Sequence, residues 1–419
     1  MTLFHLTWKS FLNRKATLLM MLLSISMSVV LLLGVDIIRQ QAKEGFSSTI
    51  SSTDLIVGAR SGQINLLLYS VFHIGNATNN ITWKSYENIS QDANVKWSIP
   101  LSLGDSHRGF RVLGTSSAYF EHYRYGAKQP LAFSQGRGFE GLFDVVIGAE
   151  VAKKLGYNLG SPVVIAHGMG SASLMKHDDK PFNVVGILKP TGTPVDNTLI
   201  VSLEAIEAIH VDWQSGVQLP GSKVTAEQVL KMNLKPKQIT AFMLGLNSRL
   251  STFHLQRKIN QYRNEPLMAI LPGLALQELW GMFSFVEKTL FAISGLVVVS
   301  GVLGLLALLL SSLNERRREM AILRSVGARP IHILTLLILE SLLVTLLSVL
   351  LGIGVLYLVM FYASPLIQDQ FGVRLAVQGL SLWQWQLVGM VVAAGALAGL
   401  VPGYRAYRHS LADGMSIKL

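Results

Sequence analysis

The chain contains no cysteine and few charged residues. The absence of cysteine among its 419 residues excludes disulfide bonds and thiolate metal sites. Charged residues make up 15% and hydrophobic residues 50% of the chain, whereas about 25% of the residues in a typical soluble domain are charged. This composition excludes a disordered chain and argues against a soluble enzyme.

The sequence motifs of several catalytic sites are also missing. The dipeptide Gly-Lys, which a phosphate-binding P-loop requires, does not occur, and neither His-Glu-x-x-His nor Gly-x-Ser-x-Gly is present. We therefore predict no catalytic residue and no ATP site of the P-loop type on this chain. The net charge of +11 does not indicate a nucleic-acid partner, because more than half of this excess positive charge lies beside the apolar segments.

Four apolar segments are long enough to cross a membrane, which takes about 20 residues. A signal peptide is the alternative for the first of them, but its apolar core exceeds about 15 residues and no small-residue cleavage site follows. The predicted transmembrane helices are 16–38, 284–313, 331–363 and 385–403. Between and around them we predict a cytoplasmic amphipathic segment at 1–15, an outer domain at 39–283, a cytoplasmic coupling segment at 314–330, an outer loop at 364–384 and a cytoplasmic tail at 404–419.

The distribution of lysine and arginine predicts the orientation in the membrane. Two basic residues lie at the predicted outer ends of the helices, Lys288 and Arg374. Eleven lie on the other side: Lys9, Arg14, Lys15, Arg316, Arg317, Arg318, Arg324, Arg329, Arg405, Arg408 and Lys418. Both termini are therefore expected in the cytoplasm, and 39–283 outside it.

The outer segment has the pattern of a mixed α/β domain. Strands are expected at 143–148, 161–166 and 182–188, and helices at 203–210, 225–232 and 252–263. A short helix over 149–155 should end at Gly156. The apolar run 64–74 is too short to span a membrane and predicts a buried strand or helix. The predicted fold class is an α-helical membrane protein with four transmembrane helices and a large mixed α/β extracytoplasmic domain inserted between helices one and two.

A few polar residues are candidates for binding roles. Glu340 lies inside the third span, where an acid is costly and is a functional candidate by default; a hydrogen bond to a neighbouring helix is the structural alternative. Asp36 lies at the end of the first span, where it costs little. His167, His177, Asp178 and Asp179 are residue types that bind zinc, but a solvated loop explains them equally, and we assign no metal site there.

The segment between the second and third spans is more specific. Its Met320, Ile322 and Leu323 form an apolar edge flanked by arginines, and Gly327 is placed to end a helix. A positively charged loop that only sets topology would need the arginines but not the apolar edge. A short amphipathic helix of this kind can lie on lipid or dock in a groove of a partner protein.

This segment resembles the signature E-R-x-R-E-I-G-I-L-R-A-L-G-A of the MacB/FtsX-like permeases, the membrane subunits of type VII ABC transporters. Met320, Ala321, Ser325 and Val326 depart from it. The matching positions are Glu315, Arg316, Arg318, Glu319, Ile322, Leu323, Arg324, Gly327 and Ala328. Similar short matches occur at 339–342, 352–354 and 402–408 and, in the outer domain, at 146–160 and 182–196, but correspondence is weaker between Asp54 and Arg124.

The resemblance implies a permease that transmits the motion of a cytoplasmic ATPase across the bacterial inner membrane to its periplasmic domain. It implies two copies of this chain with two copies of an ABC ATPase, which would hold ATP and Mg²⁺ on a separate chain. Its coupling residues would be those of the matching signature together with Met320. A partner protein in the periplasm fits the same resemblance, as does export, extraction or release of a periplasmic substrate. Small residues spaced by four, at Ser300/Gly304, Gly389/Ala393 and Gly395/Gly399, are compatible with helix pairing between copies or within one chain.

The alternative function is a membrane receptor or scaffold that transports nothing. Its outer domain would bind a ligand, and its basic loop would contact a cytosolic protein. An ATPase that copurifies with the chain would favour the transporter.

Overall fold

A computed structural model describes residues 15–167, 179–214, 217–218, 224–315, 322, 325–371 and 378–408. Two compact units divide the chain. The helical unit comprises 1–41, 284–366 and 375–419, and the outer domain comprises 42–283 and 367–374. Within the described residues, four helices are long and apolar enough to cross a membrane. The predicted fold class is confirmed.

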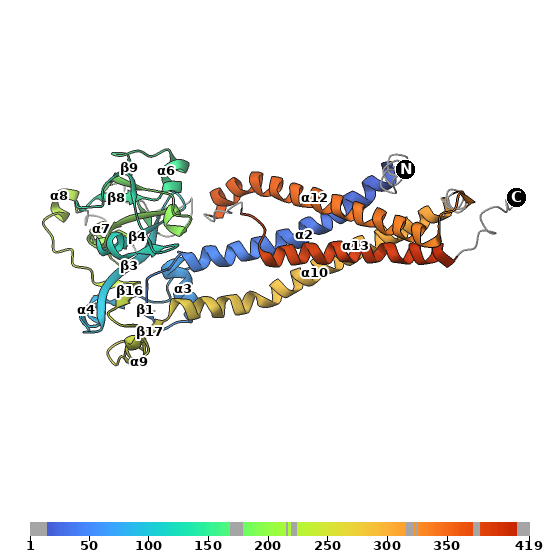
Figure 1. The fold of residues 1–419 in the computed structure, drawn as a ribbon. Helices are drawn as coiled ribbons and strands as arrows, with labels where there is room; N and C mark the ends of the chain where they lie inside the picture. The colour runs from blue at the N-terminus through green and yellow to red at the C-terminus, as the bar shows by residue number, and fades with distance from the viewer. Residues whose placement is uncertain are drawn as a thin grey trace. The chain divides into compact units, whose positions relative to one another are not determined.

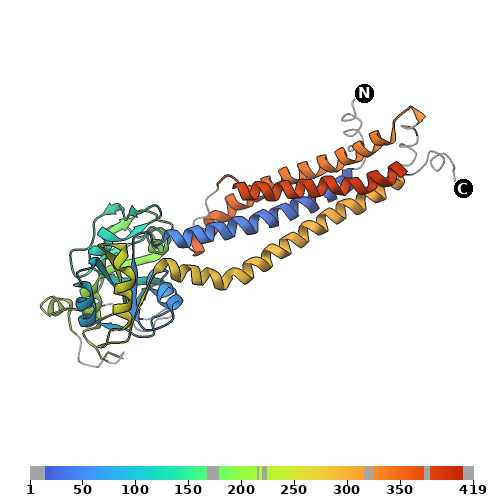
Figure 2. The ribbon, with the colours of Figure 1, turned by 60° about the horizontal axis from the view of Figure 1, so that its bottom comes forward.

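The four long helices lie side by side in the helical unit (Figure 2). They are α2 (Lys15–Ser48), α10 (Pro272–Glu315), α12 (Pro330–Phe371) and α13 (Leu382–Arg408). Each extends past its predicted span: α2 continues ten residues beyond Ile38, and α12 continues through Pro365 into the predicted loop 364–384. Their shared core contains buried residues of all four helices, among them Val29, Leu305, Val344 and Val391.

The outer domain is built on one mixed eleven-stranded sheet (Figure 1). Its main path runs β17 (Leu267–Ile270), β1 (Leu55–Ala59), β16 (Ala241–Leu246), β3 (Val95–His107), β4 (Phe110–Thr115), β12 (Thr198–Ser202), β8 (Asp144–Ile147), β11 (Phe182–Leu188) and β7 (Phe133–Gly136). The pairs β4–β12 and β8–β11 are parallel, and the other neighbours on this path are antiparallel. The strand β9 (Pro162–Val163) pairs with β11, and β10 (Ala166–His167) pairs with β3.

Helices cover the sheet, and three short two-stranded sheets lie outside it. The helices are α3 (Gln63–Val71), α4 (Trp83–Ser90), α5 (Ala118–His122), α6 (Ala149–Leu155), α7 (Leu203–His210), α8 (Ala226–Val229) and α9 (Thr252–Asn260), with 3₁₀ turns at Pro194–Asn197 and Arg249–Ser251. The short pairs are β2 (Ile81–Thr82) with β15 (Gln238–Ile239), β5 (Arg124–Tyr125) with β6 (Gln129–Pro130), and β13 (Trp213–Gln214) with β14 (Val217–Gln218).

The sheet is buried on both faces. In β1, Ile56 packs into one apolar cluster, whereas Leu55 and Val57 pack into another, as alternation along a strand requires. The first cluster includes α3 and three residues of α10, Ala275, Leu276 and Leu279. This burial on two sides explains why β1 and β16 are continuous apolar runs rather than alternating ones.

Most local predictions for the domain are confirmed, with some differences in extent. The strand predicted at 143–148 spans 144–147, and the helix predicted at 252–263 ends at Asn260. The strand at 182–188 and the helices at 149–155 and 203–210 have the predicted bounds, and Gly156 ends α6 with φ 67°. The run 64–74 is a helix, and the helix predicted at 225–232 covers only 226–229. The strand predicted at 161–166 is wrong as one element, because its two ends pair with different strands, β11 and β3.

Candidate functional site

The predicted coupling segment lies between α10 and α12. Glu315 is the last residue of α10, and α12 begins at Pro330. Ile322, Gly327 and Ala328 are described. The other predicted coupling residues lie outside the described residues: Arg316, Arg318, Glu319, Met320, Leu323 and Arg324.

The described part of this segment is one helical turn that ends at a glycine. The Val326 N–H donates to the Ile322 carbonyl oxygen at 3.1 Å, and Gly327 follows with φ 98°, a left-handed conformation that favours glycine. The predicted stop at Gly327 is confirmed. Ile322 and Val326 are 55% and 83% exposed. Because residues four apart share one helix face, the turn presents an apolar edge.

The helix α2 packs closely against two others in the helical unit. The Ser26 hydroxyl donates to the Ser348 carbonyl oxygen of α12 at 2.8 Å, and the Ser28 hydroxyl donates to the Val297 carbonyl oxygen of α10 at 3.2 Å. A Cβ added to Gly301 would lie 2.9 Å from Ser28 Oγ. Small residues therefore hold α2 against the backbones of α10 and α12, as in other membrane helix packing.

One of the small-residue pairs packs within the chain. A Cβ at Gly395 would overlap Thr345 of α12, and a Cβ at Gly399 would overlap Ser341. By contrast, a Cβ at Gly304 or Gly389 would meet nothing within 4 Å in the described residues. The Gly395/Gly399 pair thus joins α13 to α12 and gives no support for pairing between copies.

A polar cluster around Asp36 joins three helices near the outer end of α2. Asp36 is only 3% exposed and accepts a hydrogen bond from Gln384 Nε2 at 3.0 Å. Arg39, whose guanidinium lies 3.7 Å from Asp36, forms an ion pair with Glu287 of α10. Gln384 is held in place because it also accepts from the backbone N–H of Ser381 at 2.8 Å, half of a capping box that begins α13. In the sequence, the spacing Ser381-x-x-Gln384 is typical of such a capping box and could have indicated the start of a helix there.

Glu340 lies in α12 with a half-buried side chain. Its neighbour Ser341 is fully buried and donates to the Ile338 carbonyl oxygen at 2.9 Å, on the side where Gly399 of α13 approaches. Glu340 is therefore beside the α12–α13 contact, and its functional role stays a prediction.

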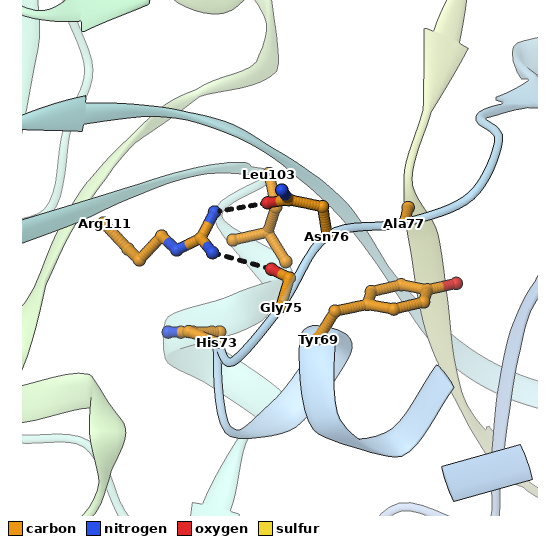
Figure 3. Close-up of a pocket in the computed structure, with 7 residues that line it drawn as sticks. All are labelled: Tyr69, His73, Gly75, Asn76, Ala77, Leu103 and Arg111. Atoms are coloured by element: carbon orange, nitrogen blue, oxygen red, sulfur yellow. Dashed lines mark hydrogen bonds between the residues drawn. The ribbon is translucent and has the colours of Figure 1, made fainter. Parts of the chain in front are cut away.

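The outer domain contains a small polar cavity beside α3 (Figure 3). Arg111 of β4 donates to the Gly75 carbonyl oxygen at 2.6 Å and to Asn76 Oδ1 at 3.1 Å, whereas its Nε is buried without a hydrogen-bond partner among the described residues. The cavity volume is about 10 Å³, which is room for one water molecule. Its lining is Tyr69, His73, Gly75, Asn76, Ala77, Leu103 and Arg111. The cavity fits a structural water better than a substrate.

His73 at this cavity is held in its neutral form. Its Nδ1 lies 2.9 Å from Thr198 Oγ1, and that hydroxyl donates to the Pro194 carbonyl oxygen at 2.8 Å. The hydroxyl has one proton, so His73 Nδ1–H must be the donor to it. Burial, with a smaller effect of the Arg111 charge, lowers the pKa of His73 from 6.5 to about 4.

One of the candidate metal-binding residues, Asp179, forms an ion pair with a neighbouring lysine. The Asp179 carboxylate lies 3.1 Å from Lys180 Nζ, which in turn lies 2.9 Å from Asp212. The side chains of Lys180 and Asp212 have no exposed surface, so this pair is a buried structural ion pair. His177 and Asp178 lie outside the described residues, and His167 is placed by its backbone in β10.

Comparisons with known proteins identify two families along the chain. The family described as MacB-like periplasmic core domain matches residues 17–236, which include the stretch 54–124, and the FtsX-like permease C-terminal family matches 291–411. No curated protein matches the chain.

Two solved structures resemble the outer domain. The periplasmic region of MacB from Actinobacillus actinomycetemcomitans has 13% identity and a TM-score of 0.33, over 55% of this chain and 94% of that one. The extracellular domain of the noncanonic ABC-type transporter YknZ from Gram-positive bacteria has 13% identity and a TM-score of 0.30, over 52% of this chain and 100% of that one. The family matches, one of which covers more than half of the chain, decide the assignment: the chain belongs to the MacB/FtsX-like permeases of ABC transporters, as a multi-pass membrane protein with a periplasmic domain between its first and second long helices.

Proposed function

We propose that this chain transmits ATPase-driven motion across the inner membrane to its periplasmic domain, and so exports, extracts or releases a substrate there. In this proposal both termini are cytoplasmic and the ATPase is a separate chain. The motion enters through Glu315–Arg329 and leaves through the outer ends of α2 and α10. The chain itself performs no chemistry.

The observation that carries the proposal is the continuity of α10. Its 44 residues give a length of about 66 Å, against about 30 Å for the hydrocarbon core of a bilayer. Its first turns contribute Ala275 and Leu279 to the core of the outer domain, and its later turns contribute Leu305 and Leu309 to the core of the helical unit. The helix α10 therefore contributes to both cores and ends at the coupling segment, which is what the proposed transmission of motion requires.

The absence of a charged pathway along the spans supports the same proposal. Among the described residues of the helical unit, Asp36 is bonded to Gln384 and Arg39 to Glu287, all toward the same end of α2. Glu340 of α12 is a single further acid and forms no row with them. The buried polar groups deeper in the unit are hydroxyls that donate to backbone carbonyls, such as Ser26 and Ser348. Such an interior transmits force between helices but offers no row of ionisable groups to a polar substrate.

The coupling segment is the part of the proposal that can be tested most sharply. Apolar anchors usually carry more of a docking interface than charges at its rim, which contribute roughly 0–1 kcal/mol each. Leu323→Asp places a charge where the partner's groove should be apolar, and it should abolish copurification of the ATPase and the ATP turnover of the complex. Leu323→Ala should weaken both more than Arg317→Ala does, which serves as the matched control.

Membrane insertion and protein level should be the same for all three variants, because the segment lies outside the spans. If Leu323→Asp retains full ATPase binding and turnover, the segment only sets topology and the coupling proposal is wrong. A cytosolic partner that is no ATPase would instead favour the receptor or scaffold.

The assembly proposed is two copies of this chain with two ATPase copies. Ser300/Gly304 and Gly389/Ala393 remain available for contact between copies, because Gly304 and Gly389 are free of close neighbours within the described residues. A native mass measurement on the detergent-purified complex tests this stoichiometry. A mass equal to one permease and one ATPase would contradict it.

A further inference from the structure

Two exposed apolar side chains lie next to each other at the β17 end of the outer domain, on α9 and the 3₁₀ turn that precedes it (Figure 1). Leu250 is 93% exposed, more than any other large apolar side chain that the structure describes, and Phe253 is 66% exposed. Residues three apart on a helix lie on the same face, so the two side chains form one apolar surface. An exposed apolar surface on a rigid support is a candidate for contact with a partner.

The opposite face of α9 is fixed to the domain. Leu255 and Ile259 pack into the apolar cluster on one face of the sheet. Gln256 Nε2 donates to the Ala269 carbonyl oxygen of β17 at 3.1 Å, and the Ala269 N–H donates to Asn260 Oδ1 at 2.7 Å. Packing inside the domain therefore explains the apolar residues on this face but leaves Leu250 and Phe253 without a structural role.

The charge beside the exposed pair has one sign. Arg249 and Arg257 lie four residues before and after Phe253, hence on the same helix face. Both side chains are exposed, and neither forms an ion pair or a side-chain hydrogen bond within the described residues. The helix itself contains no acidic residue, and Asp92, which contacts it, is already paired with Lys258 at 2.7 Å. The α9 patch comprises Arg249, Leu250, Phe253 and Arg257.

The composition of the α9 patch favours a protein partner over a lipid surface or a second copy of the chain. A helix that lies on lipid uses a long apolar face, whereas the longer apolar face of α9 is inside the domain. A symmetric contact between two copies would bring the same arginines together, and like charges repel. Arginine binds carboxylates through two parallel hydrogen bonds and, like phenylalanine, is enriched where proteins contact each other.

We propose that the α9 patch is the docking surface for a periplasmic protein, which presents an apolar pocket bordered by aspartate or glutamate side chains. Leu250 and Phe253 fill the pocket, and the two arginines pair with the carboxylates at its rim. The patch is tied to β17, which ends at Ile270, and α10 begins two residues later at Pro272. The partner therefore docks close to the start of α10. This inference does not depend on the ATPase-coupling role proposed above.

Photocrosslinking in cells of the native host tests what covers the α9 patch. The photoreactive amino acid p-benzoylphenylalanine replaces Phe253 in the full-length chain, and irradiation links it to the molecule that lies against it. We expect one protein adduct, whose partner is identified by mass spectrometry. The same amino acid at Leu159, an exposed leucine in the loop between α6 and β9, is the matched control and should not give this adduct. An adduct with lipid only, an adduct with a second copy only, or no adduct would overturn the proposal.

Direct binding of the identified protein then tests the chemistry of the contact. With both proteins purified in detergent, Leu250→Ser combined with Phe253→Ser should weaken binding by at least about tenfold. Arg257→Glu should also weaken it, and changing the contacted carboxylate of the partner to arginine should restore it. Lys189→Glu, which reverses an exposed charge just after β11, is the matched control and should leave binding unchanged.

Two further measurements separate loss of docking from other defects. Because the changed side chains are exposed, the unfolding temperature of each variant should equal that of the wild type. Copurification of the ATPase should also be unchanged, since the α9 patch is outside the coupling segment. Binding that survives in both the serine double variant and Arg257→Glu would overturn the proposal, whatever the outcome of the coupling experiment.

Discussion

Acid should weaken the outer domain through His73. The folded domain holds this ring neutral and lowers its pKa from 6.5 to about 4. As the pH falls below 6.5, the unfolded chain binds a proton that the folded domain excludes, so the free energy of unfolding decreases until the pH reaches the folded-state pKa. The stability is fully present above the unfolded pKa and is lost as the pH falls through the window between the two values.

The size of the effect follows from the two pKa values. Each pKa unit corresponds to about 1.4 kcal/mol, and the fraction of the shift that is expressed between pH 7 and pH 5 amounts to about 2 kcal/mol. For a domain of this size, that loss lowers the unfolding temperature by about 4–8 °C. Burial also lowers the pKa of His107, so the wild-type protein alone does not isolate the contribution of His73.

The variant His73→Asn isolates the contribution of His73 to the acid sensitivity. Asparagine tolerates the left-handed backbone at this position, where φ is 55°, and its amide nitrogen takes the place of Nδ1 as donor to Thr198. The variant keeps the hydrogen bond and has no group that titrates. The unfolding temperature is measured at pH 7 and at pH 5 in the full-length detergent-purified protein. Between these two pH values, the unfolding temperature of the variant should fall by about 4–8 °C less than that of the wild type. Equal drops in the two proteins would refute the assignment of the acid sensitivity to this ring.

Two further predictions concern the helical unit. Gly395→Ala should lower the free energy of unfolding by about 1–3 kcal/mol, because its Cβ would overlap Thr345. Gly389→Ala, whose Cβ meets nothing within 4 Å in the described residues, should be neutral or stabilising. Unfolding of the two variants in detergent compares them directly, and equal stability would contradict the packing described. Ser28→Cys with Gly301→Cys should form a disulfide on mild oxidation, because Ser28 Oγ lies 2.9 Å from the position of a Cβ at 301 and a disulfide sulfur lies about 3 Å from its partner's Cβ. Oxidation should then lower the ATP turnover of the complex, and a reductant should restore it. The double variant Ser28→Cys/Gly304→Cys is a control that should not cross-link. Full turnover in the cross-linked protein would show that α2 and α10 do not move against each other.

The elements that could be predicted from sequence are those with local signals. The helix at 149–155 was visible because Gly156 stops it, and the strand at 182–188 because five of its seven residues are Phe, Val, Ile or Leu. The segment 161–166 failed for the opposite reason. Its two ends pair with strands that are distant in sequence, so nothing within the segment marks the break.

Among the candidate sites, too, the features with a local sequence signal were predicted and those that depend on distant residues were not. The stop at Gly327 is local and was predicted, whereas the surroundings of Asp36 depend on Gln384, which is 348 positions away in the sequence. The contact between Asp105 of β3 and His210 of α7 likewise requires the order of the strands, which no motif encodes.

The pairing of β1 with β17 has a consequence for how the outer domain can be replaced. These are the first and last strands of the sheet along the chain, and they are hydrogen-bonded neighbours in register, for example Val57 opposite Ala269. Neighbouring strands lie about 4.8 Å apart, so the chain enters and leaves the domain through adjacent positions. A domain that begins and ends on such a pair would likewise present its two chain ends side by side. In the coupling role proposed above, the domain between α2 and α10 could therefore be exchanged for another of this kind while the membrane helices are kept.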